Sequence, residues 1–150
     1  MTLTQKESSL IKDLKSQEKL CIDKYTKGAN EACDGQLKSL FTQLSQTEQR
    51  HFDTLTQIEN GTVPQMNAGS EPQPQFTATY GTAQTPQKQT DCFLCSDALA
   101  MEKHASSMYD VSIFEFAQPQ LRDVLNHIQK EEQGHGEKIY SYMSCNNMYS

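Results

Sequence analysis

The sequence contains an internal repeat, and this repeat restricts the fold more than any other feature. Residues 12–60 align without gaps with residues 96–144. Each copy has a Glu in its first half and a Glu-x-x-His in its second half, and these polar residues stand among apolar residues at helical spacing. The identical pairs include Glu18/Glu102, Tyr25/Tyr109, Glu48/Glu132 and His51/His135. We therefore expect two copies of one helical unit.

Apolar residues recur every three or four positions in four segments, which predicts two helices before residue 61 and two after residue 90. Between them, residues 61–90 hold four of the five prolines and three of the seven glycines and show no periodic pattern, which predicts a linker. Helices in a bundle with short loops need only about 2 to 8 connecting residues. The longer linker favours a connection that travels the length of a bundle, and disorder of this segment is the alternative.

Residues that favour helix ends stand near each expected boundary. They are Thr4 with Glu7 in a capping box, Asp34 before the second helix, Asn60 and Gly61 at its end, Asp91 or Thr90 before the third helix, and Pro119 in the first turn of the fourth. The sequence thus predicts an all-α four-helix bundle that forms one domain over residues 1–150. Its parts are a first hairpin at 4–60, a long crossover linker at 61–90 and a second hairpin at 91–146.

The composition narrows the classes of partner. The chain has 13 Lys and Arg against 19 Asp and Glu, and its net charge of -6 argues against binding to nucleic acid or to an anionic membrane surface. No segment approaches the roughly 18 apolar residues of a membrane span. The first residues, MTLTQKESSL, lack the pattern of a secretory signal, so we expect an intracellular protein.

The cysteines point to reduced thiols. Their number, five, is odd and they are spread over the chain, which does not suit a disulfide framework. Cys92 and Cys95 stand at the expected start of the third helix, where the helix dipole lowers thiol pKa values. A redox or metal-capturing role for this pair stays open, since one pair cannot complete a four-thiolate site and no thioredoxin-like strand pattern surrounds it.

Mirror-related spacing predicts that four carboxylates converge. Glu18 and Glu48 are equally distant from the first expected turn, and Glu102 and Glu132 are equally distant from the second. In antiparallel hairpins such residues lie at the same height, about 22 Å from the turn at 1.5 Å per residue. All four continue the apolar stripes of their helices, so they are expected to point into the bundle.

Four inward carboxylates require neutralisation, because burying an unpaired charge costs several kcal/mol or forces protonation. Four carboxylates with two neutral imidazoles, those of His51 and His135, carry a charge that two divalent cations cancel. One Glu from each of two helices plus a Glu-x-x-His from each of the other two is the ligand set of di-iron and di-manganese bundles. Oxygen and imidazole ligands favour iron or manganese over copper. The alternative is a bundle that keeps the pattern without binding metal, since a single Glu-x-x-His occurs by chance on many helices.

At these residues the chain resembles the ferritin-like superfamily, which includes the rubrerythrins. The resemblance implies that Glu18 and Glu102 are terminal ligands, that Glu48 and Glu132 bridge two ions, and that the two histidines are terminal nitrogen ligands. Tyr25 and Tyr109 resemble rubrerythrin tyrosines that contact the ligands, although they suit a core position equally well. The chain departs from rubrerythrins at Ala105, where they carry a further Glu, and it lacks a second Cys-x-x-Cys for a rubredoxin iron site.

The second hairpin resembles the coat F domain of spore coat proteins in the segments DALAMEKHASSMY, FAQPQLRDVL and YSYMSCNNMYS. This resemblance implies a location in the spore coat and other coat proteins as partners, and it leaves a homodimer open. Two functions follow as hypotheses. One is a di-iron protein that reacts with peroxide or oxygen, and the other is a structural coat component in which any bound metal stabilises the fold.

Overall fold

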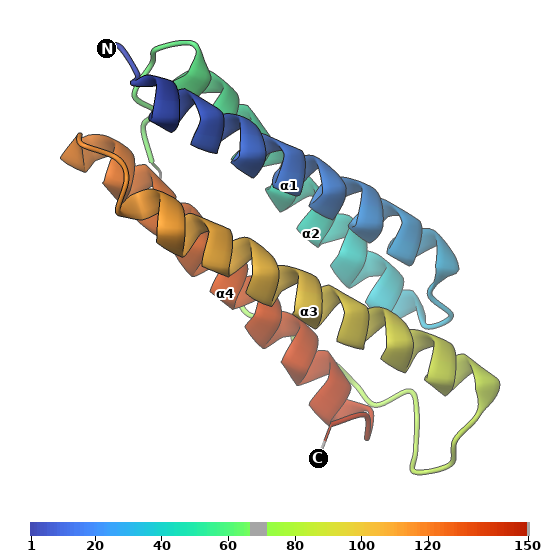
Figure 1. The fold of residues 1–150 in the computed structure, drawn as a ribbon. Helices are drawn as coiled ribbons and strands as arrows, with labels where there is room; N and C mark the ends of the chain where they lie inside the picture. The colour runs from blue at the N-terminus through green and yellow to red at the C-terminus, as the bar shows by residue number, and fades with distance from the viewer. Residues whose placement is uncertain (67–71, 150) are drawn as a thin grey trace.

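The computed structural model describes residues 1–66 and 72–149, which form four long helices (Figure 1). These are α1 (Gln5–Glu31), α2 (Gly35–Glu59), α3 (Pro86–Ile113) and α4 (Pro119–Cys145). No strand occurs within the described ranges. The predicted all-α four-helix architecture is therefore confirmed.

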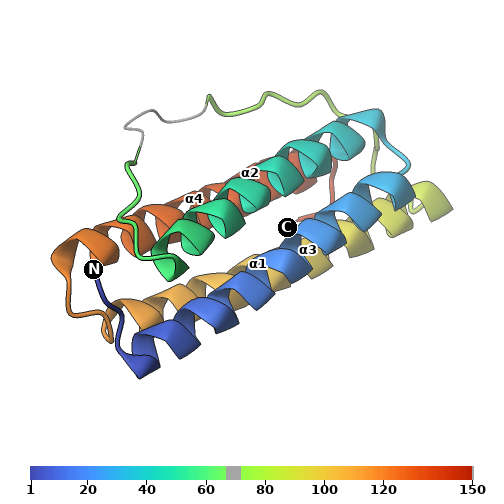
Figure 2. The same ribbon diagram turned by 90° about the horizontal axis from the view of Figure 1, so that it is seen from above.

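The helices pack as two hairpins laid against each other. Helix α1 pairs with α2 and α3 pairs with α4, and the hairpins meet where α1 packs on α3 and α2 packs on α4. The α1–α2 turn and the α3–α4 turn lie at opposite ends of the bundle (Figure 1). The connection from α2 to α3 must therefore span the bundle as a long crossover, and its described residues after position 71 run along the bundle beside α2 and α4 (Figure 2).

The last part of this crossover is hydrogen-bonded to one end of the bundle. The Gln36 side chain accepts from the Thr77 backbone N–H at 3.0 Å and donates to the Thr77 carbonyl at 2.7 Å. The Asn146 side-chain oxygen accepts from the backbone N–H groups of Thr79 and Tyr80, at 2.7 and 3.0 Å. Part of the predicted linker is thus an ordered strap. Residues 67–71 of the linker lie outside the described residues.

Most of the expected helix ends are present. The Thr4 hydroxyl and the Glu7 carboxylate form the predicted capping box of α1, and the Asp34 side chain caps α2 by accepting from the Gln36 N–H. Asn60 ends α2, and Gly61 follows with a φ of 88°, a conformation that glycine adopts without strain. Pro119 opens α4 as predicted.

The predicted start of α3 at Thr90 or Asp91 is wrong. The helix begins at Pro86, and the Thr85 hydroxyl caps it by accepting from the Lys88 N–H. Asp91 lies more than one turn inside the helix, where it is fully buried and bonded to another part of the fold. The second hairpin consequently starts earlier than expected.

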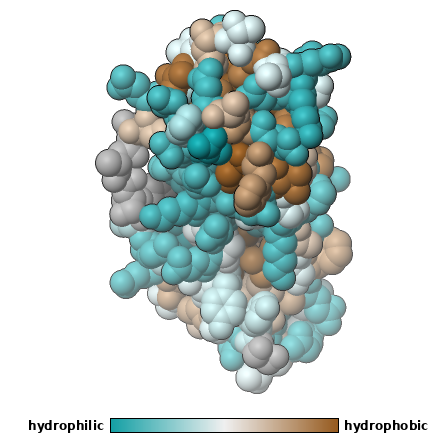
Figure 3. Space-filling view, turned by 60° about the vertical axis from the view of Figure 1, so that its left-hand side comes forward, coloured by the Kyte–Doolittle hydropathy of each residue, from teal (hydrophilic) through white to brown (hydrophobic). Residues whose placement is uncertain are grey.

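The interior is apolar towards both ends of the bundle and polar at its middle. One apolar cluster surrounds Tyr25, Phe41 and Tyr142, and the other surrounds Leu14, Leu55 and Ile128. On the outside, polar side chains cover most of the face drawn in Figure 3, and apolar ones gather there in a patch in its upper half. The two internal clusters enclose a layer of buried polar groups, which is where the repeated motifs meet.

Candidate metal centre

Six buried side chains from all four helices meet in this middle layer. Between 0% and 3% of each residue is exposed. They are the six residues that the repeat singles out: Glu18, Glu48, His51, Glu102, Glu132 and His135. Each continues the apolar stripe of its helix, and the antiparallel hairpins bring them to one height. The structure therefore brings together every residue of the predicted ligand set, while their role as ligands stays a prediction.

The two hairpins approach each other through crossed Glu–His contacts. The His51 Nδ1 atom lies 2.8 Å from Glu132 Oε1, and the His135 Nδ1 atom lies 2.8 Å from Glu48 Oε1. The two imidazole rings are stacked, with centroids 5.9 Å apart. Each histidine thus faces the Glu of the other copy of the motif, and the internal repeat of the sequence becomes a symmetry of the site.

The six side chains form two overlapping groups, each compact enough to hold a metal ion. Within each group, one ligand atom per residue lies within 4.8 Å of all the others. The first group is Glu18, Glu48, His51 and Glu132, and the second is Glu48, Glu102, Glu132 and His135. Glu48 and Glu132 belong to both groups. Their position between the groups suits carboxylates that bridge two ions.

The cluster contains many buried polar atoms without a hydrogen-bond partner. Among the described residues, all such side-chain atoms belong to the centre: Glu18 Oε2, both oxygens of Glu48, His51 Nδ1, Glu102 Oε2 and both oxygens of Glu132. The short Glu–His contacts therefore lack hydrogen-bond geometry. Leaving one buried polar group unsatisfied costs about 1 to 3 kcal/mol, and more when it is charged. A cation in contact with these atoms would remove that cost, so the residues present fit a metal.

Burial and mutual repulsion divide the carboxyl groups into two kinds. Burial raises the pKa of Glu48 and of Glu132 well above the usual range, and the charges of Glu18 and Glu102 add to the rise. Burial opposes ionisation of Glu18 and Glu102 as well, but polar contacts outweigh it and lower the pKa of each. The contact with His51 has the largest lowering effect for Glu18, and the contact with Glu132 has it for Glu102. Without metal, the two central carboxyls therefore retain a proton more readily than an ordinary Glu, and the two outer ones lose it more readily.

Two buried tyrosines hold the outer carboxylates from across the hairpin interface. The Tyr25 hydroxyl donates to Glu102 Oε1 and the Tyr109 hydroxyl donates to Glu18 Oε1, each at 2.5 Å. Both tyrosines are no more than 1% exposed. Each hydroxyl therefore orients a carboxylate of the opposite hairpin, as the resemblance to rubrerythrins implies, and any part in a reaction stays a prediction.

One functional contact was missed at the sequence level. Glu131 Oε1 lies 3.0 Å from His51 Nε2 and 3.2 Å from His127 Nε2. The hydrogen bond with His51 lowers the pKa of Glu131 to about 2. Contacts of this kind fix a histidine ring so that its other nitrogen faces a metal. The repeat gives no signal for Glu131, because Thr47 stands at its equivalent position in the first hairpin.

The expectation that Cys92 and Cys95 open a helix is wrong. Helix α3 begins at Pro86, so the pair lies beyond the first turn, where the helix dipole acts little. Burial raises the pKa of Cys95, which opposes thiolate formation. All five cysteines are free thiols. Within the described part of the chain, none joins a group that could hold a metal ion.

Comparison with known proteins gives one match. Residues 90–150 match the family model of the Coat F domain, so the similarity covers most of α3 and all of α4. No curated protein and no solved structure matches the chain. None of the described helices combines the length and the apolar character that spanning a membrane requires. The match agrees with the resemblance of the second hairpin, and the first hairpin lies outside it.

Proposed function

We propose that this chain is a coat F-type spore coat protein whose ferritin-like bundle holds two metal ions, most simply iron, in a carboxylate centre. The observation that carries the proposal is the pair of overlapping ligand groups that share Glu48 and Glu132. The unpaired buried oxygens of the same residues support it, since they leave acceptor positions that a cation would satisfy.

The ligands divide evenly between two ions. His51 and Glu18 belong to one group, His135 and Glu102 belong to the other, and the central carboxylates belong to both. Four ionised carboxylates carry four negative charges, which two divalent cations neutralise. Oxygen and imidazole donors without thiolate favour iron or manganese.

Iron bound here would supply the electrons that reduce peroxide or oxygen. The chain itself contributes orientation. The Tyr25 and Tyr109 hydroxyls hold Glu102 and Glu18 in place, and Glu131 holds the His51 ring. The apolar clusters cover the layer of ligands towards both ends of the bundle. Such preorganisation strengthens every charge interaction within the centre.

A structural role in the spore coat is the second candidate, and the Coat F match over residues 90–150 favours it. In this case the centre, with or without metal, serves to hold the two hairpins together. Other coat proteins or a second copy of the chain would then bind to the outer surface of the bundle. The two candidates differ in turnover and not in the residues that hold metal.

Metal analysis of purified protein tests the proposal. We expect about two metal ions per chain, and an absorbance change of the iron-loaded protein when hydrogen peroxide is added. Glu132→Ala removes a shared ligand and should lower the metal content. Glu115→Ala removes an exposed carboxylate far from the centre and should not. An unchanged metal content in Glu132→Ala would contradict the ligand assignment. A protein that lies in the coat and binds two ions, but does not react with peroxide, would favour the structural role.

A further inference from the structure

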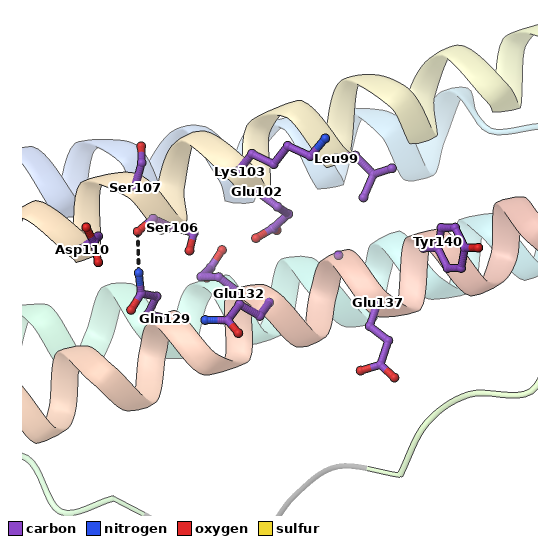
Figure 4. Close-up of a pocket in the computed structure, with 12 residues that line it drawn as sticks. Leu99, Glu102, Lys103, Ser106, Ser107, Asp110, Gln129, Glu132, Glu137 and Tyr140 are labelled. Atoms are coloured by element: carbon purple, nitrogen blue, oxygen red, sulfur yellow. Dashed lines mark hydrogen bonds between the residues drawn. The ribbon is translucent and has the colours of Figure 1, made fainter. Parts of the chain in front are cut away.

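A groove between α3 and α4 opens onto the candidate metal centre (Figure 4). Its volume is about 700 Å³, and Glu102 and Glu132 are among its lining residues. These two side chains point towards each other from facing helices, with the groove beside them (Figure 4). Both residues are at least 97% buried and retain oxygens without a hydrogen-bond partner. The groove thus connects the surface with unsatisfied acceptors of the centre.

The groove has mostly carbon walls. On one side of the carboxylates the Gln129 side chain donates to the Ser106 carbonyl at 2.9 Å and links the two helices. Leu99 and Tyr140 lie on the other side of the carboxylates (Figure 4). A volume of roughly 300 to 1,000 Å³ with apolar walls and a few polar groups is typical of sites for small organic ligands.

The internal repeat explains why this groove is open. Position 136 is Gly in the second hairpin, and the equivalent position of the first hairpin is Phe52. A Cβ at Gly136 would meet only Leu99 Cδ2, at 3.9 Å, so the space beside it is free. In the first hairpin the Phe52 ring occupies the corresponding place, with Lys15 Nζ 5.0 Å above its centroid. The Gly136/Phe52 difference is thus one of the differences between the copies that leave space beside the second hairpin's carboxylates.

The hollow that Phe52 lines does not reach the centre. Its other lining residues are Lys12, Lys15, Ser16, Lys19 and Glu59, and none of the six candidate ligands is among them. The groove of the second hairpin, by contrast, has two of the candidate ligands in its wall. Entry to the centre is therefore asymmetric, although the ligands themselves are symmetric.

We propose that the α3–α4 groove binds an uncharged, mainly apolar organic molecule against Glu102 and Glu132. Acidic residues in the wall, which include Asp110 and Glu137, outnumber the one basic residue, Lys103, and so disfavour an anion. The carbon walls disfavour a cation, which would lose hydration there. This binding goes beyond the proposed function, and it requires no metal.

Ligand titration of the full chain, metal-free and metal-loaded, tests the groove. The probes are benzyl alcohol and benzoate, which are similar in size and differ in charge, and binding is followed by amide chemical shifts and by calorimetry. We expect benzyl alcohol to shift the amides of Leu99 and Gly136, and benzoate to bind at least about tenfold more weakly. Gly136→Phe should weaken benzyl alcohol binding about tenfold or more, because it places in the groove the residue that fills the first hairpin.

Two matched variants distinguish filling of the groove from a disturbance of α4. Gly136→Ala leaves the groove open and should bind benzyl alcohol like the unaltered protein. Gly134→Phe makes the same change in the same helix at a residue that does not line the groove, where a Cβ meets nothing within 4 Å, and it should also bind normally. Should Gly136→Phe fail to fold, Ser106→Ile fills the groove from α3 with the residue found at the equivalent position of the first hairpin.

Three results would overturn the inference. The first is that benzyl alcohol and benzoate bind equally well. The second is that Gly136→Phe binds benzyl alcohol as well as the unaltered protein does. The third is that the protein sediments as a dimer and that Gly136→Phe converts it to a monomer. The last would show that a second copy covers the groove. Metal content is measured on the same samples. Two ions without probe binding would refute the groove alone, and probe binding without metal would refute the proposed function alone.

Discussion

The carboxyl groups of the centre show how one residue type acquires opposite pKa shifts in one cluster. Glu48 and Glu132 lie between other carboxylates, and burial together with repulsion raises their pKa values. Contacts with His51 for Glu18 and with Glu132 for Glu102, and after them the tyrosine hydroxyls, lower the pKa values of the two outer carboxyls. A metal-free centre therefore favours protons on the carboxyls that both ions would share.

The stability of metal-free protein should depend on pH in a direction that these shifts set. A raised pKa in the folded state stabilises at low pH, and the contribution of Glu48 and Glu132 is lost as pH rises through their raised values. The lowered pKa values of Glu18 and Glu102 act in reverse, and their contribution is lost as pH falls through them. The free energy of unfolding in urea should fall as pH rises above the ordinary range of Glu, and in the double variant Glu48→Gln/Glu132→Gln it should fall less. An identical pH profile in both proteins would contradict the assignment.

Glu131 provides a test that leaves all six candidate ligands in place. Its hydrogen bond to His51 Nε2 orients the ring, so Glu131→Gln should weaken metal affinity by about 10- to 100-fold, as loss of such outer contacts does in other metal sites. Glu137→Gln, an exposed change on the same helix, is the control. Competition with a metal chelator measures both affinities. Equal affinity in the two variants would show that Glu131 does not support the ligand.

At the scale of helices, Asp91 joins three parts of the chain. From within α3 its carboxylate accepts from the backbone N–H groups of Cys33 and Asp34, at 2.8 and 2.9 Å, and from the Tyr80 hydroxyl at 2.6 Å. The α1–α2 turn and the crossover strap are thereby attached to the second hairpin. This contact also explains why the residue is buried and does not cap its own helix.

Asp91→Ala should destabilise the fold by at least about 2 kcal/mol, since it removes a buried carboxylate that accepts from two backbone N–H groups and from the Tyr80 hydroxyl. Asp97→Ala is a matched change in the same helix. Asp97 is paired with Lys24 at a partly exposed position, and its loss should cost no more than about 1 kcal/mol. Urea unfolding measures the loss of stability in both variants. Similar losses in the two variants would mean that Asp91 does not hold the turn.

The helices could be predicted from the sequence because each has an apolar stripe and most have a local capping signal, as Thr4 with Glu7 and Asp34 show. The start of α3 was missed because Thr85 and Pro86 lie in the proline-rich segment, while the partners of Asp91 are distant in sequence. In the site, the repeat identified the candidate ligands and the tyrosines, because both copies contain them. It could not reveal Glu131 or the groove at Gly136, since both depend on differences between the copies.

At the scale of the whole molecule, the centre lies where the two hairpins meet and where the core is polar. Metal binding to the folded state alone should therefore stabilise the bundle, by about 2.7 kcal/mol for each ion when free metal is 100-fold above its dissociation constant. Thermal unfolding with and without Fe²⁺ under anaerobic conditions measures this, with Mg²⁺ as a control ion. Glu132→Ala should show a smaller shift. Equal shifts with Mg²⁺ and in the variant would indicate binding elsewhere.

The central claim is that two ions lie between the hairpins, sharing Glu48 and Glu132. Anomalous diffraction at the iron edge from crystals of iron-loaded protein tests it most directly. The account predicts two neighbouring anomalous peaks, one beside His51 with Glu18 and the other beside His135 with Glu102. A bundle of the same fold with no peak between these residues, or with iron bound only at its surface, would contradict it.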